Sequence, residues 1–161
     1  MVTLPHPIVV VAHDVRSAHN VGAIFRTADS AGLRHVYLTG FTPGPDHRGV
    51  TKTALGAQDA VPWTYDASLG AVLGRLRAEG YAIAALERTA DAVPPSDVRA
   101  EHFPLALVLG NEVTGVDAAV LEAADLVVGL PQYGVKASLN VSVAFGVAAY
   151  GLVDRFRTLR P

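Results

Sequence analysis

Short runs of apolar residues recur along the 161-residue chain, separated by stretches of helical length. The runs lack strict alternation of apolar and polar positions, which is typical of strands covered on both faces. We expect five such strands, at Ile8–Ala12, His35–Thr39, Tyr81–Leu86, Leu105–Leu109 and Leu126–Leu130. Strands that alternate with helices indicate βαβ units, so the pattern predicts an α/β fold with a mostly parallel sheet flanked by helices.

Between these runs, apolar residues recur at the three- and four-residue spacing of amphipathic helices. One helix is predicted at 20–31 and a second at 67–79, with Gly32 and Gly80 as their stop signals. Asn20 is a candidate N-cap for the first of them, because its side chain can accept a hydrogen bond from a free backbone N–H.

The segment Asn140–Leu152 differs from both helices, because apolar or small residues occupy every side of its helical wheel. A helix of this kind is expected to be buried all round. Two interpretations stay open. Either the helix is central, packed between the sheet and its neighbours, or its Gly and Ala side admits a second subunit.

The composition limits the class of protein further. A chain of 161 residues predicts one domain, over 1–161, that needs no disulfide or zinc for stability. The absence of Cys excludes disulfides, thiol nucleophiles and Cys-ligated metals, and it favours a reduced, cytoplasmic location. The N-terminus lacks the features of a signal peptide, and no apolar run reaches the roughly 18 residues that a membrane span needs.

The net charge of −2 argues against a polycation that binds nucleic acid through its phosphates alone. The charge is unevenly distributed, however. Residues 1–60 carry five basic and four acidic side chains, 61–125 carry four and ten, and 126–161 carry four and one. If the two ends meet in space, they form a mildly basic face; ordinary solvated surface is the alternative.

The usual nucleotide-binding and hydrolase fingerprints are missing. The first predicted strand is followed by HDVRSAHNVGAIF, which contains neither G-x-G-x-x-G nor a Walker G-K-[ST]. No G-x-S-x-G nucleophile elbow is present either. His13 and His19, six residues apart with Asp14 beside the first, form only a weak metal constellation, and we expect no metal.

Three polar clusters remain, each embedded in apolar sequence. They lie at 19–28 (HNVGAIFRTA), 109–116 (LGNEVTGV) and 130–143 (LPQYGVKASLNVSV). In the first cluster Arg26 lies off the middle of the apolar helix face, so its side chain is expected to point to a cleft or to solvent. Each cluster alone has an ordinary explanation, as a capped helix, a tight turn and a second capped helix.

Together, and in this order, the clusters resemble the three motifs of the SpoU/TrmH family of RNA ribose methyltransferases, in the SPOUT class. Asn20–Ala28 matches the N-x-G-x-x-x-R-T-A motif, 109–112 the L-G-N-E motif and 131–143 the P…S-L-N-V-S-V motif. The resemblance covers essentially the whole chain, and the KTALGA segment at 52–57 is similar to a short single-domain branch. Val113 stands where the second motif commonly has Gly.

The resemblance implies a fold that general topology rules would not predict, because the C-terminal part is threaded through a loop in a deep trefoil knot. It also implies homodimers and a pocket for S-adenosylmethionine, held largely by backbone contacts in the loops after the last two strands. By position, the cofactor-binding residues are Leu86, Gly110, Leu130 and Leu139.

The implied reaction is in-line transfer of the cofactor's methyl group to a ribose 2′-hydroxyl of tRNA or rRNA, which leaves S-adenosylhomocysteine. The family motif points to Arg26, yet a guanidinium is a poor base at neutral pH. Arg26 is therefore either transiently neutral and deprotonates the hydroxyl, or charged and clamps a phosphate or the developing alkoxide while another group takes the proton. Glu112, Ser138 and Asn140 are expected to orient Arg26 and the ribose, and Asn20 to cap or brace the first helix.

RNA capture is expected at the protein surface, since the chain leaves no room for a separate RNA-binding domain. The candidate phosphate contacts are the basic side chains of the two net-positive thirds, Arg16, Arg48, Lys52, Lys136, Arg155 and Arg157. The main alternative is a knotted RNA-binding module without catalysis, which the presence of all five polar motif residues disfavours. A flavodoxin-like small-molecule binder is a more distant alternative.

Overall fold

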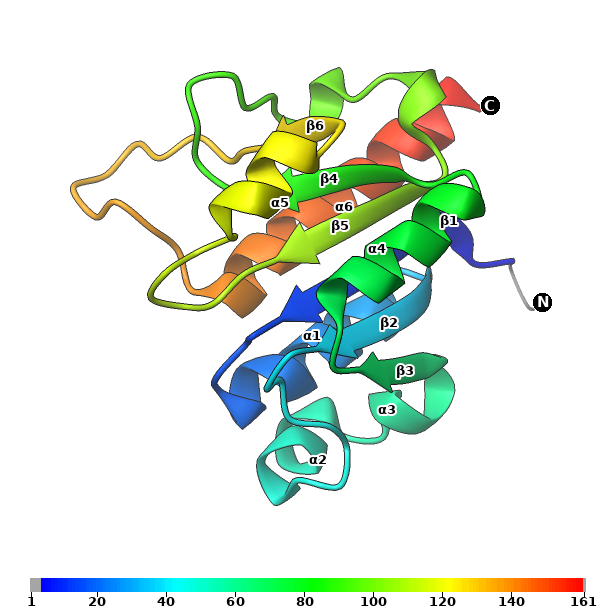
Figure 1. The fold of residues 1–161 in the computed structure, drawn as a ribbon, viewed down its shortest axis with the longest axis vertical. Helices are drawn as coiled ribbons and strands as arrows, with labels where there is room; N and C mark the ends of the chain where they lie inside the picture. The colour runs from blue at the N-terminus through cyan, green and yellow to red at the C-terminus, as the bar shows by residue number, and fades with distance from the viewer. Residues whose placement is uncertain (1–3, 161) are drawn as a thin grey trace.

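Six parallel strands form the central sheet of the computed structural model, which describes residues 4–160 (Figure 1). Their spatial order is β3-β2-β1-β5-β4-β6, so β1 and β5 are central and β3 and β6 form the edges. The strands are β1 His6–His13, β2 Leu33–Thr39, β3 Trp63–Asp66, β4 Ala82–Leu86, β5 Leu105–Leu109 and β6 Leu126–Val128.

Helices cover both faces of this sheet (Figure 1). On one face α1 and α6 pack against strand residues such as Ile8, Val10 and Ala12, and on the other face α4 and α5 pack against Val9 and Val11. This alternation follows from the two-residue period of a strand. The helices are α1 Ala18–Ser30, α2 Arg48–Ala54, α3 Ala57–Ala60, α4 Leu69–Ala78, α5 Ala118–Ala123 and α6 Val141–Leu159, with 3₁₀ turns η1 Pro95–Asp97 and η2 Ala100–His102 before β5.

The five strands expected from the sequence all form, and the α/β class with a parallel sheet is confirmed. The strand at 63–66 was not expected from an apolar run, because it lies at the sheet edge. Trp63 is 40% exposed and Tyr65 is 51% exposed. An edge strand that is covered on one side only carries no continuous apolar pattern.

The prediction that Asn20 caps the first helix is wrong. The helix begins at Ala18, and the Ser17 hydroxyl accepts the backbone N–H of Asn20 at 3.2 Å. Asn20 therefore lies in the first turn of α1, and its side chain is available for contacts outside the helix.

The expectation that the last helix is buried all round is also wrong for the single chain. Phe145 and Leu152 on α6 are fully buried, whereas Val143, Val147 and Tyr150 are 51–53% exposed. These three residues recur at helical spacing and share one face of α6. The helix thus leaves an apolar face uncovered. No helix among residues 4–160 is both long and apolar enough to cross a membrane.

Candidate active site

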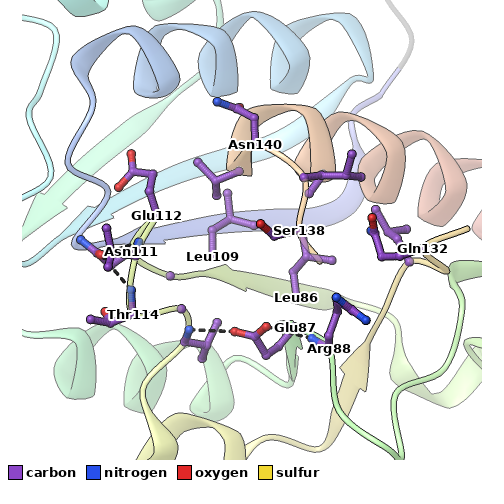
Figure 2. Close-up of a pocket in the computed structure, with 18 residues that line it drawn as sticks. Leu86, Glu87, Arg88, Leu109, Asn111, Glu112, Thr114, Gln132, Ser138 and Asn140 are labelled. Carbon is purple, nitrogen blue, oxygen red and sulfur yellow. Dashed lines mark hydrogen bonds between the residues drawn. The ribbon is translucent and has the colours of Figure 1, made fainter. Parts of the chain in front are cut away.

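A cavity of about 370 Å³ opens where β4, β5 and β6 end (Figure 2). Its walls come from Leu86–Arg88 after β4, from 109–116 at the end of β5, and from residues within 130–144, between β6 and the start of α6. The three segments meet because neighbouring parallel strands end at the same edge of a sheet, which is where α/β proteins bind ligands. The volume lies within the range of about 300–1,000 Å³ that is typical of small-molecule sites.

Most of the residues singled out in the sequence line this one cavity. All four candidate cofactor-binding residues are among them, together with three of the five candidate catalytic residues. They are Leu86, Gly110, Leu130 and Leu139, and Glu112, Ser138 and Asn140. The leucine side chains give part of the wall an apolar surface, which suits a flat aromatic ring.

The Glu112 side chain joins the loop after β5 to the start of α1. Its carboxylate accepts hydrogen bonds from the backbone N–H of Arg16 at 2.8 Å, the backbone N–H of Ser17 at 3.0 Å and the side-chain amide of Asn20 at 3.0 Å. Partial desolvation raises the pKa of Glu112, but the hydrogen bonds from Ser17, Arg16 and Asn20 outweigh it and hold the pKa below its ordinary value. Glu112 is therefore an ionised acceptor at the positive end of α1.

Asn20 connects this carboxylate to the third motif. Its amide oxygen accepts a hydrogen bond from the side-chain amide of Asn140 at 3.1 Å. Asn140 caps α6, since its own amide oxygen accepts the backbone N–H of Ser142 at 2.9 Å and of Val143 at 3.4 Å. A chain of side-chain hydrogen bonds thus links Glu112, Asn20 and Asn140, one residue from each motif.

Gly110 is required where the backbone of the β5 loop folds back on itself. A Cβ atom at this position would lie 2.3 Å from the carbonyl carbon and oxygen of Gly115 and 2.4 Å from the nitrogen of Val116. Because these are backbone atoms, no side-chain rotation can relieve the clash. The glycine of the second motif therefore allows the loop to close one wall of the cavity.

Asn111 shapes the turn that follows. Its side-chain oxygen accepts the backbone N–H of Val113 at 2.8 Å and of Thr114 at 3.1 Å, and its amide donates to the carbonyl of Asp14 at 2.9 Å. Val113 does not have a positive φ and its side chain is 81% exposed. The turn accordingly accommodates valine at the position where the motif commonly has glycine.

Arg26 lies outside the cavity. It is exposed on α1 and lines a second, more open hollow with Lys52 from α2 and Tyr150 from α6. Within residues 4–160, no hydrogen bond or ion pair holds its guanidinium. The structure therefore does not bring Arg26 against Glu112, Ser138 or Asn140, and the side chains expected to orient it line the cavity instead.

The candidate RNA contacts occupy different positions on the surface. Arg16, Arg48, Lys52, Lys136 and Arg157 are all exposed. Arg155 is half-buried, and its guanidinium donates to the carbonyl of Val98 at 2.8 Å, so part of its role is structural.

The histidines considered for a metal site do not come together as one. The ring of His13 lies 3.3 Å from the carboxylate of Asp14 and 3.5 Å from that of Asp117, and its other nitrogen is 2.9 Å from the Thr39 hydroxyl. Across the part of the chain that the structure describes, no group of three or more His, Asp or Glu side chains has the arrangement of a metal site.

Sequence reasoning did not single out several cavity residues that follow the strand ends. Glu87 and Arg88 come directly after Leu86, and Gln132 lies in the loop after β6. The rule that ligands bind at the carboxyl ends of parallel strands was the available signal, since it applies to β4 as much as to β5 and β6.

A parallel α/β sheet with a ligand-sized cavity at its carboxyl edge defines a broad class of ligand-binding proteins, and comparison with known sequences narrows it. The sequence model of the SpoU rRNA methylase family matches residues 7–150, and the chain belongs to this family. Similar proteins include a 23S rRNA (guanosine-2′-O-)-methyltransferase of Ralstonia nicotianae, 35% identical over 156 residues, which cover 96% of this chain and 61% of the relative. A tRNA (guanosine(18)-2′-O)-methyltransferase of Escherichia coli is 31% identical over 143 residues, with 89% and 61% covered.

Solved structures agree with the sequence comparison. The TrmH/SpoU tRNA modifying enzyme of A. aeolicus has a TM-score of 0.82 and 28% identity, with 95% of this chain and 77% of that chain covered. An AdoMet-bound rRNA methyltransferase from Sinorhizobium meliloti has a TM-score of 0.83 and 28% identity, with 91% and 57% covered. The chain spans about three-fifths of the length of the two curated relatives named above.

Proposed function

We propose that this protein transfers the methyl group of S-adenosylmethionine to a ribose 2′-hydroxyl of tRNA or rRNA. The observation that carries the proposal is the cavity at the ends of β4, β5 and β6, lined by Leu86, Gly110, Leu130 and Leu139 and linked to α1 through Glu112. The names of the two curated relatives, 2′-O-methyltransferases of rRNA and tRNA, support the same reaction.

The residues of the cavity fit the cofactor. Leu86, Leu130 and Leu139 offer apolar surface to the adenine ring, and Gly110 lets the loop after β5 close one wall of the cavity around the ligand. The bound sulfonium supplies an activated methyl group, so the protein needs no metal for the transfer. Ser138 and Asn140 line the same cavity, and they are the candidates to orient the RNA ribose that accepts the methyl group.

Arg26 acts as a charged clamp in this proposal. A guanidinium carries five N–H donors, and none of those of Arg26 has a partner among residues 4–160. They are free to bind an RNA phosphate or the developing alkoxide, for which a planar, permanently charged donor is well suited. Because a guanidinium is also a poor base at neutral pH, the clamp is favoured over the version in which a neutral Arg26 removes the proton, and another group accepts the proton of the 2′-hydroxyl.

The hollow around Arg26 is the proposed entry point for RNA. Lys52 lines the same hollow, and Arg48 lies on the same short helix as Lys52. Arg16, next to α1, and Lys136, in the loop after β6, are further candidates for phosphate contacts. Lysine and arginine contacts to phosphate position the substrate without reading its sequence.

We further propose a homodimer in the cytoplasm, in which a second copy covers the apolar face of α6. Tyr150 belongs both to this face and to the hollow around Arg26, so the second copy would border the RNA site. Val147→Asp should convert the dimer to a monomer in sedimentation equilibrium. Ala119→Asp, at an exposed position of α5, should leave it a dimer. A dimer that withstands Val147→Asp contradicts this interface.

The trefoil knot is also part of the proposal. Its support comes from the chain around β6, which lies against the segment after β4. Val93 pairs with both Val127 and Gly129 through backbone hydrogen bonds of 2.9 Å, and the Arg88 guanidinium donates to the carbonyl of Ala137. The segment between β6 and α6 thus runs along the loop after β4. A knot would form if the chain passed through this loop.

The reaction is tested by incubating the purified protein with methyl-labelled S-adenosylmethionine and bulk tRNA or rRNA, followed by mass spectrometry of the nucleosides. We expect label in one 2′-O-methyl nucleoside, and the same nucleoside should be missing from RNA of cells that lack the gene. RNA binding without any new 2′-O-methyl nucleoside would favour the non-catalytic knotted RNA-binding module instead.

A further inference from the structure

Glu87 is a carboxylate in the cavity wall that lies outside the three motifs. It directly follows Leu86 at the end of β4 and is partly buried. One carboxylate oxygen accepts the backbone N–H of Val116 at 3.1 Å, and the other accepts the backbone N–H of Arg88 at 2.9 Å. Figure 2 shows its carboxylate directed toward the loop after β5, beside Leu86.

The two carboxylates that line the cavity have different free capacity. Glu112 already accepts three hydrogen bonds, all from the start of α1. Glu87 accepts two, both from backbone N–H groups. An ionised carboxylate has about four acceptor positions, so Glu87 keeps room for donors from a ligand.

The position of Glu87 selects the part of the cofactor that would supply those donors. The leucine surface suited to adenine includes Leu86, its immediate neighbour in the chain. In S-adenosylmethionine the ribose is bonded to adenine, so the donors nearest to that surface are the ribose hydroxyls and the 6-amino group of adenine, and the deoxy analogues below test the hydroxyls. A carboxylate after a strand of a parallel sheet is a recurrent acceptor for ribose hydroxyls in α/β proteins.

We propose that Glu87 binds the cofactor by accepting a hydrogen bond from a ribose hydroxyl. The inference rests on the proposed function, since it requires S-adenosylmethionine in this cavity.

Glu87 also fixes the loop after β5, and the test has to separate the two roles. Its carboxylate accepts the backbone N–H of Val116 in that loop at 3.1 Å. Removal of the carboxylate therefore frees the loop as well as the proposed ligand contact. A simple loss of affinity in Glu87→Ala would not distinguish them.

A cycle that changes both the side chain and the ligand separates the roles. Calorimetry would give the dissociation constants of S-adenosylhomocysteine and of its 2′-deoxy and 3′-deoxy analogues for the wild type, Glu87→Gln and Glu87→Ala. The wild type should bind one deoxy analogue about tenfold more weakly than the parent. Glu87→Ala should bind S-adenosylhomocysteine about tenfold more weakly than the wild type does. It should bind the deoxy analogue little more weakly still, because the effects of removing two groups that contact each other are not additive.

Two variants complete the design. Glu87→Gln keeps an oxygen that can accept the Val116 N–H, so the loop is held, and the deoxy penalty should still shrink. This variant decides the question if Glu87→Ala does not fold. Glu122→Ala removes an exposed carboxylate from α5 and should bind all three ligands as the wild type does.

The possible outcomes separate this inference from the proposed function. In both variants, the loss of affinity caused by the missing ligand hydroxyl could add fully to the loss caused by the substitution. That result would mean that Glu87 acts through the loop alone, and it would overturn the inference. Equal affinity of the wild type for all three ligands would overturn it as well. A wild type that binds none of the three would overturn the cofactor assignment together with it.

Discussion

The cavity at the ends of β4, β5 and β6 and the hollow around Arg26 are built in opposite ways. Hydrogen bonds within the chain fix the shape of the cavity. Those of Glu112, Asn20 and Asn140 form a continuous network, and Glu87 accepts a hydrogen bond from the loop after β5. In the hollow, Arg26 and Lys52 are exposed, and neither side chain is held by a hydrogen bond or an ion pair to the described residues. One half of the site is preorganised, and the other consists of long side chains that keep their rotamer freedom.

This difference indicates where binding energy has to come from. A preorganised cavity binds its ligand without a further loss of conformational entropy in its own walls. The cations of the hollow lose side-chain entropy only when they meet a partner, which the proposed function supplies as RNA and a second copy of the chain. Variants in the two regions should therefore separate the chemistry from cofactor binding.

Arg26→Lys should have the largest effect on turnover and almost none on the cavity. Lysine keeps the charge but loses the planar fork, so we expect RNA methylation to fall about 100- to 1,000-fold, as when a transition-state donor is removed. The affinity for S-adenosylhomocysteine and the melting temperature should stay at wild-type values, since Arg26 is exposed and has no partner among residues 4–160. Arg99→Lys is the control, because Arg99 is an exposed arginine in the segment before β5, where it pairs with Glu101. Turnover near that of the wild type would contradict both roles considered for Arg26.

Gly110→Ala should have the reverse effect. The new Cβ atom would meet backbone atoms at 2.3 Å, and overpacking of this kind costs about 1–3 kcal/mol. We expect calorimetry to show S-adenosylhomocysteine bound about 10- to 100-fold more weakly, while RNA binding in a filter assay is unchanged. Gly134→Ala is the control, because a Cβ atom there meets nothing within 4 Å. If RNA binding falls in parallel with cofactor binding, the two halves are not independent.

The preorganised half was also easier to predict from the sequence. Strand β5 has the predicted bounds Leu105–Leu109, and the cavity residues beside it follow from motif positions. The Asn20 cap was predicted wrongly because Ser17 is an equally good cap three residues earlier, whereas the actual partners of Asn20 are 92 and 120 residues away. Local patterns carry no information on such contacts.

Two further features were beyond the reach of the sequence for other physical reasons. The apolar face of α6 has the composition of a buried helix, and composition does not distinguish burial by the same chain from burial by a second one. Glu87 belongs to none of the three motifs, and the strand-end rule marks the region after β4 without saying which side chain there faces the cavity, so the geometry of the cavity singled it out.

The smallest expected effect concerns Glu112, whose side chain links the loop after β5 to α1, the helix that carries Arg26. The pKa of Glu112 is lowered in the folded protein, so the unfolded state binds its proton at higher pH than the folded state does. Its contribution to stability is therefore fully present above the pKa of the unfolded state and is lost as the pH falls through the folded pKa. Glu112→Gln removes this dependence. Because Glu112 is exposed, we expect the difference between wild type and variant to be less than about 1 kcal/mol in denaturant unfolding.

The same titration tests how far the link between the halves matters for the site. Protonation of Glu112 weakens its hold on Arg16, Ser17 and Asn20, which are the contacts that fix α1 to the cavity loop. The affinity for S-adenosylhomocysteine should then fall over the same acidic window in the wild type, and less so in Glu112→Gln. An identical pH profile in the two proteins would mean that the cavity keeps its shape without this contact, and the preorganisation would have to come from Asn111 and Glu87 instead.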